Sequence, residues 1–413
     1  MTRQYVVPGR VELVGKHVDY AGGRSLTCAV DLALHVRAQP VSEPVIRVRT
    51  SLHRGLVSIQ LDARAARKRA TWSTYVAAVA RRFARDFPHF RTGVDLQIHS
   101  ELPASAGLSS SSAFVVAVAN ALADANDADQ DPAWIDAVPN SLARAEYYSA
   151  IETGAPYGTF AGEDGVGVRG GAQDPIAIIC AAEGAVSQFS YLPARLERRV
   201  PWPADFVLAI GVSGVRATKT GNARDKYNRA ADAMRALAGA WNAVTGRDDE
   251  TVAKALASAP DAGDRLAVVA SDRAAMLGDE YLVRRLAQFR EETEIIVPSV
   301  CDALRDRDLA AIGQLVDRSQ QLAERALGNQ VPETITLVRT AREHGAVAAS
   351  AFGAGFGGAV WAMVSADTAS AFVDEWRGRY AAAFPKHVAN ARWIVTKPSG
   401  PLRETSDEPA RGD

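Results

Sequence analysis

The sequence has few cysteines, and it has no excess charge of either sign. Its 413 residues include three cysteines, Cys28, Cys180 and Cys301, which lie far apart and form no C-x-x-C pair. A scattered, odd-numbered set predicts neither a disulfide framework nor a cysteine zinc site. The formal net charge is -1, from 47 Lys and Arg against 48 Asp and Glu. The overall charge therefore gives no reason to expect nucleic acid or an anionic membrane as a partner.

Long hydrophobic runs are absent as well. The first residues, MTRQYVVPGRVELVGKH, lack the apolar core of a signal peptide. The longest apolar runs, such as residues 113–119, are far too short to cross a bilayer. We therefore expect a cytoplasmic protein with no membrane partner, either a monomer or a homodimer.

The hydrophobic pattern changes along the chain from strands to helices. The strand-like runs are 5–7, 11–14, 25–30, 34–38, 45–50, 57–61, 94–99, 177–180, 185–189, 206–212 and 360–364. Helical periodicity marks 71–86, 113–125, 141–151, most of 222–343, and 368–381. Glycine-rich turns are expected at 154–171 and 346–358. The pattern predicts an α+β protein of two lobes, 1–200 and 201–397, followed by a disordered tail at 398–413.

A glycine and serine loop precedes the helix predicted at 113–125. It contains Gly107, Leu108, Ser109, Ser110, Ser111 and Ser112. Glycine lets the backbone approach a ligand closely, and the N–H groups at a helix N-terminus can bind phosphate oxygens. No Lys-Ser or Lys-Thr pair follows, so this is not the P-loop pattern. The alternative is a helix capped by serine after a turn.

Two further segments combine unusual residue types. PGRVELVGKHVDYAGG, at 8–23, packs cationic, acidic and aromatic groups into a turn, which suits a polyhydroxylated ligand but also an exposed charged turn. SAFGAGFGG, at 350–358, contains Gly353, Gly355 and Gly357 before an apolar run. Its backbone is expected either to lie against a ligand or another loop, or to form a flexible turn.

Together, the three segments resemble the superfamily of galactokinase, homoserine kinase, mevalonate kinase and phosphomevalonate kinase, abbreviated GHMP. The first is similar to the galactokinase signature G-R-x-N-x-x-G-E-H-x-D-Y. The loop is similar to the superfamily's P-x-x-x-G-L-S-S-S-A phosphate loop, with one extra serine, and 350–358 is similar to its C-terminal glycine motif. The resemblance spans nearly the whole chain. It implies a two-lobed GHMP kinase fold, with a β-rich N-terminal lobe, an α/β C-terminal lobe and the active site in the cleft between them.

The resemblance also implies a reaction and the residues that perform it. The γ-phosphoryl group of ATP would pass to a sugar hydroxyl, expected to be the anomeric one of galactose or a related sugar. GGAQDP, at 170–175, occupies the place of the family's catalytic stretch, so Asp174 is the candidate base and Arg10 its partner. Without the family, a structural ion pair between them would be the simpler interpretation.

The resemblance assigns the remaining ligands one by one. Lys16, His17, Asp19 and Tyr227 match positions that contact sugar in galactokinases. Mg2+ is expected on a loop serine, Ser110 or preferably Ser111, and on a helix glutamate. Glu146, Glu152 and Glu163 all precede Asp174, and of these Glu152 is preferred.

Two departures from the signature bear on the substrate. Lys16 stands where galactokinases have Glu, and Glu12 where they have Asn. A cation there would suit an acidic or phosphorylated sugar, such as galacturonate or a heptose phosphate, better than galactose. The glycine-rich stretch 154–171 is longer than in galactokinases and is expected to be a lid, a wall of the sugar pocket or a surface excursion.

Other activities remain open on sequence alone. One is a kinase for another small alcohol, although the signature from Arg10 to Asp19 argues against mevalonate and homoserine. Another is a catalytically inactive sensor of sugar and ATP. Because a sensor has no need of Arg10 and Asp174, the presence of both argues against it.

Overall fold

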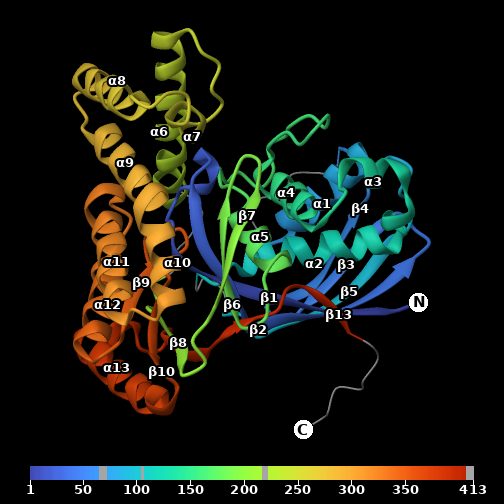
Figure 1. The fold of residues 1–413 in the computed structure, drawn as a ribbon. Helices are drawn as coiled ribbons and strands as arrows, with labels where there is room; N and C mark the ends of the chain where they lie inside the picture. Colours follow the sequence, from blue (N-terminus) through green and yellow to red (C-terminus); the bar gives the residue numbers. More distant parts are fainter. Residues whose placement is uncertain (65–71, 104–106, 216–221, 406–413) are drawn as a thin grey trace.

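The fold is built around two β-sheets, each with helices packed against it (Figure 1). The computed structural model describes residues 1–64, 72–103, 107–215 and 222–405, without the side chains of 222–227. Within these residues, nine strands form the first sheet and four form the second. The predicted α+β class is confirmed.

Strand β2 (Arg24–Val41) organises the first sheet because its 18 residues are long enough to pair with several strands. One edge pairs with β1 (Arg3–Val14). The other edge pairs in turn with β6 (Ala185–Ser190), β12 (Pro398–Ser399) and β5 (Gly93–Ser100). The sheet is completed by β3 (Val45–Thr50), β4 (His53–Gln60), β7 (Arg195–Pro201) and β13 (Arg403–Thr405). The pair β3 and β5 is parallel, and the other pairs are antiparallel.

Helices α1 (Ser73–Asp86), α2 (Ser110–Ala125), α4 (Ser141–Thr153) and α5 (Gln173–Ile179) cover one face of this sheet (Figure 1). Helix α2 contacts β1, β2 and β5. Its apolar residues from Ala113 to Ala119 are buried, and the alanines and valines among them let the helix lie close to the strands on one side and to its helical neighbours on the other. The short helix α3 (Pro132–Ala137) lies at the far end.

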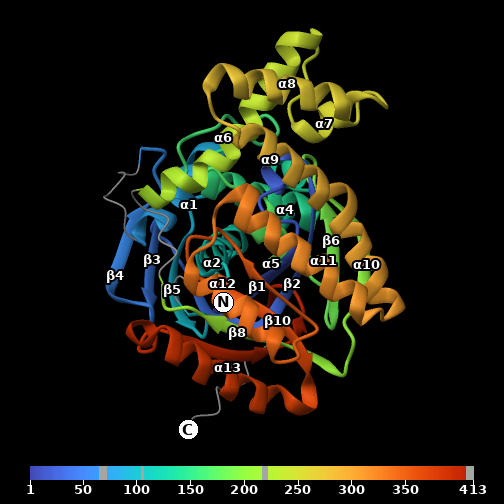
Figure 2. The same cartoon turned by 90° about the vertical axis from the view of Figure 1, so that its left-hand side faces the viewer.

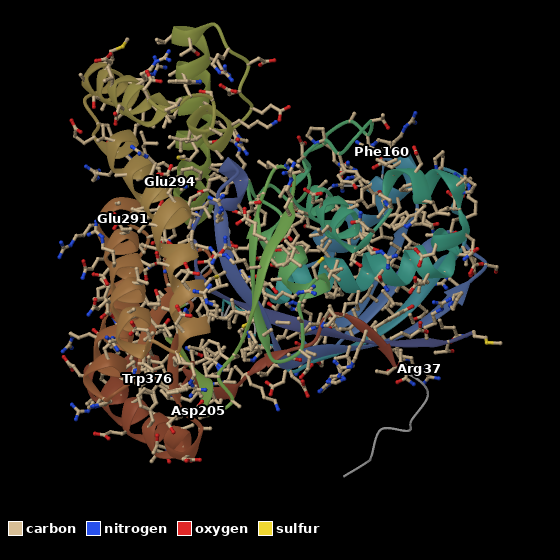
Figure 3. All side chains as sticks on the ribbon, in the orientation of Figure 1. Arg37, Phe160, Asp205, Glu291, Glu294 and Trp376 are labelled. Carbon is tan, nitrogen blue, oxygen red and sulfur yellow. The ribbon has the colours of Figure 1, made fainter. Side chains whose placement is uncertain are left out.

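The second sheet has the antiparallel order β11 (Arg392–Thr396), β8 (Phe206–Val212), β10 (Ala359–Ser365) and β9 (Ala348–Phe352). Helices α12 (Pro332–Glu343) and α13 (Ala369–Ala383) pack against it. Trp376, labelled in Figure 3, is fully buried there and donates its indole N–H to the carbonyl oxygen of Leu337 at 3.0 Å. The chain passes from the first sheet to the second between Pro201 and Phe206.

Helices α6 (Asn222–Thr245), α7 (Val252–Leu256), α8 (Ala262–Leu277) and α9 (Tyr281–Arg290) form an arm beside the two sheets (Figure 1). Helix α9 continues without a break through a π-helical turn, η3 (Glu291–Ile296), into α10 (Val297–Asp306). Helix α10 contacts β2, and α11 (Leu309–Leu322) contacts β1 and β9. Figure 2 shows these helices in front of the first sheet, so the second half of the chain covers part of the first. No helix in the described part of the chain is long and apolar enough to span a membrane.

Three local predictions were wrong. Residues 177–179 belong to helix α5 and Cys180 caps it, so the run is not a strand. A four-residue apolar run cannot distinguish the two. The segment 346–358 is not all turn, because it contains β9. The tail from residue 398 is not disordered as far as residue 405, because β12 and β13 pair with β2 and β1. Residues 406–413 lie outside the described part.

Candidate active site

Asp174 and Arg10 are brought together from opposite ends of the first lobe's sequence. Arg10 lies on β1, and Asp174 lies in the first turn of α5. Arg10 Nε donates to Asp174 Oδ1 at 2.6 Å, and Arg10 Nη2 is 2.6 Å from the same oxygen. The Arg10 side chain is 4% exposed and that of Asp174 is 20% exposed. The carboxylate is thus held in a fixed direction while part of it stays open to a ligand.

The same guanidinium reaches the serine loop. Arg10 Nη1 donates to the carbonyl oxygen of Gly107 at 2.5 Å. On the other side of the carboxylate, Ser109 Oγ donates to Asp174 Oδ2 at 2.5 Å, and Ser112 Oγ lies 3.4 Å from that oxygen. Arg10, Asp174 and the loop 107–112 therefore form one connected cluster, as the sequence predicted.

The backbone of the serine loop leads directly into a helix N-terminus. Ser109 has a left-handed conformation, with φ 57° and ψ 39°, and α2 begins at Ser110. A non-glycine residue in this region costs about 1–2 kcal/mol, and the bond from Ser109 to Asp174 offsets that cost. The first N–H groups of a helix have no partner within the helix and carry a partial positive charge. A loop of this kind can bind an anion, here beside Asp174.

The glycine motif faces this loop from the second sheet. It connects β9 to β10, and a Cβ atom at Gly353 would lie 3.4 Å from the carbonyl oxygen of Gly107. The other two glycines contact protein: a Cβ atom at Gly355 would lie 2.4 Å from the carbonyl oxygen of Asn329, and one at Gly357 would lie 2.7 Å from that of Val215. Of the two interpretations offered above, close approach to another loop is the one seen in the structure.

Asp19 and His17 lie on the other side of Asp174. Asp19 Oδ2 accepts a hydrogen bond from the backbone N–H of Gln173 at 3.2 Å. Burial, and then the nearby charge of Asp174, raise the pKa of Asp19 to about 6. A Cβ atom at Gly171 would lie 2.5 Å from Asp19 Oδ2, so only glycine lets the two segments meet. His17 contacts the Tyr20 hydroxyl through Nδ1 at 3.1 Å and the Ala354 carbonyl through Nε2 at 3.2 Å.

Lys16 is not a free cation in this structure. Its side chain is 1% exposed, and Nζ donates to Ser319 Oγ at 2.7 Å. Ser319 Oγ in turn donates to Glu292 Oε1 at 2.5 Å. Burial lowers the pKa of Lys16, and the charges of Glu292 and then Glu12 oppose that shift. The positive charge at position 16 is therefore matched by acids within the protein.

Glu12, the second departure from the signature, lies beside the base. Its Oε2 accepts from Gln173 Nε2 at 2.6 Å, and Gln173 directly precedes Asp174. Burial raises the pKa of Glu12 to about 7, against the opposing charges of Lys16 and Arg10. The Lys16 charge lowers the pKa of Glu12 and the Glu12 charge raises that of Lys16, so the two departures influence each other.

Of the three glutamates considered for Mg2+, Glu152 faces the serine loop. Its Oε2 accepts from Ser112 Oγ at 2.8 Å. Glu146 instead accepts from the backbone N–H of Ala194 at 2.8 Å, and Glu163 pairs with Arg81 at 3.4 Å. The serine that meets Glu152 is Ser112 rather than the preferred Ser111. Within the described residues, no group of three or more His, Cys, Asp and Glu could hold a metal by itself. A bound Mg2+ would therefore need phosphate oxygens as further ligands, as is usual for this ion.

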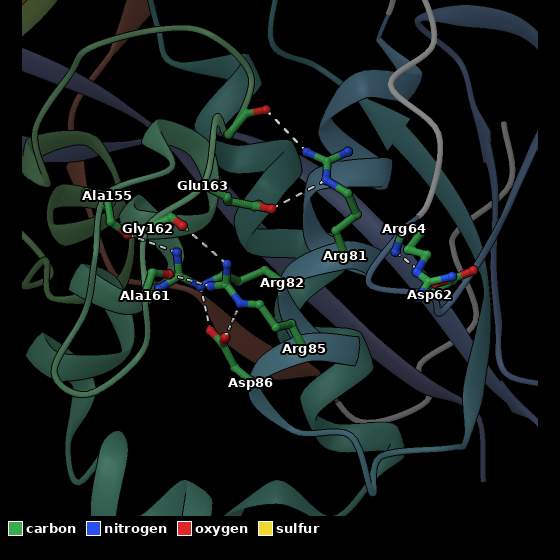
Figure 4. Close-up of polar contacts among 11 residues, drawn as sticks. Asp62, Arg64, Arg81, Arg82, Arg85, Asp86, Ala155, Ala161, Gly162 and Glu163 are labelled. Atoms are coloured by element: carbon green, nitrogen blue, oxygen red, sulfur yellow. Dashed lines mark hydrogen bonds and ion pairs between the residues drawn. The ribbon is translucent and has the colours of Figure 1, made fainter.

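The glycine-rich stretch 154–171 is fastened to helix α1 (Figure 4). Arg82 donates to the carbonyl oxygen of Ala155 at 2.9 Å, and Arg85 to that of Ala161 at 2.6 Å. Arg81 donates to the carbonyl oxygen of Gly165 at 3.3 Å. Three arginines of one helix therefore hold the stretch in place, and its far end leads to Gly171 and Asp174.

The sequence-based interpretation missed a group of buried residues behind the signature, Gln173, Arg285, Gln288, Glu292 and Ser319. Polar residues at helical spacing in 285–292 were a weak signal, because such a pattern is typical of a solvated helix face. Tyr227, predicted to contact sugar, lies in α6, and its side chain is outside the described part.

Comparison with known proteins identifies the family. Three family models match the chain: the galactokinase galactose-binding signature at residues 3–40, the GHMP kinases N terminal domain at 74–154, and the GHMP kinases C terminal region at 301–382. A galactokinase of Chloroflexus aurantiacus is 31% identical over 386 residues, covering 90% of this chain and 86% of the relative. The chain belongs to the galactokinase family. Membership makes it a carbohydrate kinase that uses ATP, and it confirms the predicted resemblance.

More distant galactokinases and solved structures agree with this assignment. A galactokinase of Lactiplantibacillus plantarum is 24% identical, covering 90% of this chain and 87% of the relative. The crystal structure of Lactococcus lactis galactokinase complexed with galactose superimposes with a TM-score of 0.77 at 21% identity, covering 97% of this chain and 95% of that one. A mevalonate kinase from L. major has a TM-score of 0.56 at 15% identity, with 96% of each chain covered. At these identities the two structures show the fold alone.

Proposed function

We propose that this member of the galactokinase family transfers the γ-phosphoryl group of ATP to the anomeric hydroxyl of galactose or a closely related neutral sugar. The observation that supports it most is the position of Asp174. Its carboxylate lies between the Arg10 guanidinium, 2.6 Å away, and the Ser109 hydroxyl of the serine loop, 2.5 Å away. A proton acceptor and an anion-binding helix N-terminus are thus adjacent, as phosphoryl transfer requires.

The proposed reaction follows from this arrangement. The sugar hydroxyl loses its proton to Asp174 as its oxygen forms a bond to the γ-phosphorus. The bond from that phosphorus to the bridging β-phosphate oxygen breaks, and its electron pair leaves with ADP. Arg10 fixes the direction of the carboxylate and supplies positive charge near the transferring group. Residues 107–112 bind phosphate oxygens with backbone N–H groups and hydroxyls.

Mg2+ fits the residues around the loop. Glu152 supplies a carboxylate that contacts the Ser112 hydroxyl, and Ser111 precedes Ser112 in the first turn of α2. When bound, the ion would neutralise charge on the β- and γ-phosphates. Glu152 and the two serines would orient it toward the loop.

The sugar side is proposed to be formed by Asp19, His17 and Tyr227, with Gly171 beside Asp19. Asp19 offers a carboxylate to sugar hydroxyls, and His17 a ring that can donate or accept. We assign Lys16 no direct sugar contact, because its ammonium group is buried and bonded to Ser319. An acidic group on the substrate would meet a lysine whose charge Glu292 already compensates. This weighs against galacturonate or a heptose phosphate as the substrate.

An ATP-consumption assay over a sugar panel tests the proposal. The panel contains galactose, arabinose, galacturonate and heptose phosphates, with NMR of the product to locate the new phosphate. We expect galactose to be the best substrate and the phosphate to be on C1. Preference for galacturonate or a heptose phosphate would overturn the neutral-sugar assignment. Binding of sugar and ATP without turnover would instead show a sensor.

A further inference from the structure

One face of the continuous helix formed by α9, η3 and α10 lies along the galactokinase signature. Arg285, Gln288 and Glu292 project from this face at intervals of three and four residues, and all three are fully buried. Their neighbours Glu291 and Glu294, labelled in Figure 3, lie on the outer side of the helix. We call Arg285, Gln288 and Glu292 the helix clamp.

Each clamp residue bonds the backbone of a different signature residue. Glu292 Oε2 accepts from the N–H of Gly15 at 2.8 Å, and Gln288 Nε2 donates to the carbonyl oxygen of Lys16 at 2.9 Å. Arg285 Nη2 donates to the carbonyl oxygen of His17. The clamp therefore binds the backbone of three consecutive residues, and the helix and the signature run in opposite directions along these contacts.

Arg285 also reaches a side chain of the signature. Its Nη2 donates to the Tyr20 hydroxyl at 3.1 Å, and that hydroxyl is 3.1 Å from His17 Nδ1. The guanidinium thus influences both the backbone and the ring of His17. At the end of the signature, a Cβ atom on Gly23 would lie 2.5 Å from Thr293 Oγ1, so the loop is flush against the same helix.

The signature needs such support because its backbone is strained. Gly15 has φ 93° and His17 has φ 57°, both in the left-handed region. For a non-glycine residue, this conformation persists only where the surroundings impose it. Glu292 bonds the backbone of Gly15 directly, and Arg285 bonds that of His17.

The helix is itself irregular at this point. Residues Glu291–Ile296 form a π-helical turn, which rotates the side chains that follow it relative to an uninterrupted α-helix. The turn begins beside Glu292, whose second oxygen, Oε1, accepts from Ser319. At the start of this turn, one carboxylate bonds both the signature backbone and the serine that holds Lys16.

We propose that Arg285, Gln288 and Glu292 are positioning residues that set the affinity for sugar by holding the signature in its binding conformation. The proposal rests on the function proposed above, because it assigns sugar contact to His17 and Asp19. The clamp touches neither the serine loop nor Asp174 in the described contacts, so its effect should be confined to the sugar. The clamp residues form hydrogen bonds to backbone groups of the signature, and none of them takes part in phosphoryl transfer.

The test compares buried and exposed positions on the same helix. Gln288→Met removes both the donor to the Lys16 carbonyl oxygen and the acceptor for Arg285 Nη1, while keeping length and burial. Arg284→Met, at an exposed neighbouring position, is the matched control. Because both bonds are buried, we expect Gln288→Met to raise the KM for galactose by at least about tenfold. The KM for ATP should change less than about twofold, and the control should match wild type.

A second readout does not depend on the substrate. Hydrogen exchange at residues 15–20 should be faster in Gln288→Met and in Arg285→Met than in the control, with exchange in α2 unchanged. Arg285→Lys should recover part of the effect, because it keeps one donor but not the fork. Equal rises in both KM values, or unchanged exchange at 15–20, would overturn the proposal. Wild type that binds or turns over no sugar would refute the proposed function, while the exchange data would still decide whether the clamp holds the signature.

Discussion

Replacing Asp174 with asparagine is expected to lower kcat by about a hundredfold to ten-thousandfold, the usual contribution of a positioned proton acceptor. Asparagine keeps the shape of the side chain. Its oxygen can accept from Arg10, and its amide can face Ser109, so the local hydrogen bonds can be kept. What it cannot do is take the proton of the sugar hydroxyl.

The measurement is steady-state turnover of galactose together with equilibrium binding of ATP. We expect ATP binding to remain within about threefold of wild type, because the serine loop keeps its backbone groups. Asp136→Asn, at an exposed position on α3, is the matched control and should retain full activity. If Asp174→Asn retained more than about a third of wild-type kcat, Asp174 would not be the base.

Arg10→Lys is expected to lower kcat by about a hundredfold to a thousandfold, as loss of one preorganised donor at a reacting group does. Lysine keeps the charge, but it lacks the planar fork that contacts Asp174 and the Gly107 carbonyl at once. One of these two groups would lose its partner. The base and the serine loop would then no longer be held in a fixed relation.

The control for this variant is Arg37→Lys, an exposed arginine on the neighbouring strand β2, labelled in Figure 3. It should leave kcat and both KM values unchanged. A merely structural Arg10 would give a different result: Arg10→Lys would lower the melting temperature but leave kcat per folded molecule near wild type. Stopped assays normalised to folded protein, by circular dichroism, separate the two cases.

The candidate site was largely predictable because its residues lie in short motifs that encode a backbone shape. Gly107 to Ser112 form a turn at a helix N-terminus, and a glycine and serine run before an apolar helix is visible in the sequence itself. The partnership of Arg10 with Asp174 was not local, and it came from the resemblance to a family. Bond lengths of 2.6 Å between them confirm that the two residues meet.

Lys16 shows where sequence-based reasoning was incomplete. Taken by itself, a lysine in place of the signature glutamate favoured an acidic substrate. The structure places Glu292 and Ser319, about three hundred residues away in sequence, around that ammonium group. A charge on one segment can be interpreted only with the charges that fold against it, and no local pattern identifies those partners.

The errors in the fold have the same origin. Residues 403–405 form a short, polar strand, and nothing in their composition favours it over a loop; pairing with β1 supplies the missing stabilisation. Similarly, the runs at 25–30 and 34–38 belong to one strand, because the residues between them continue the pairing along β2. Long-range pairing decided these elements, whereas helices with clear periodicity, such as α1 and α2, were predicted within a few residues.

The most direct test of the account is a crystal structure of the Asp174→Asn variant with galactose, Mg2+ and a non-hydrolysable ATP analogue. We predict that the γ-phosphate lies on residues 107–112, and that the anomeric hydroxyl lies within about 3.2 Å of the side chain at position 174. A sugar bound with a different hydroxyl toward position 174, or a nucleotide whose phosphates lie away from the serine loop, would contradict it.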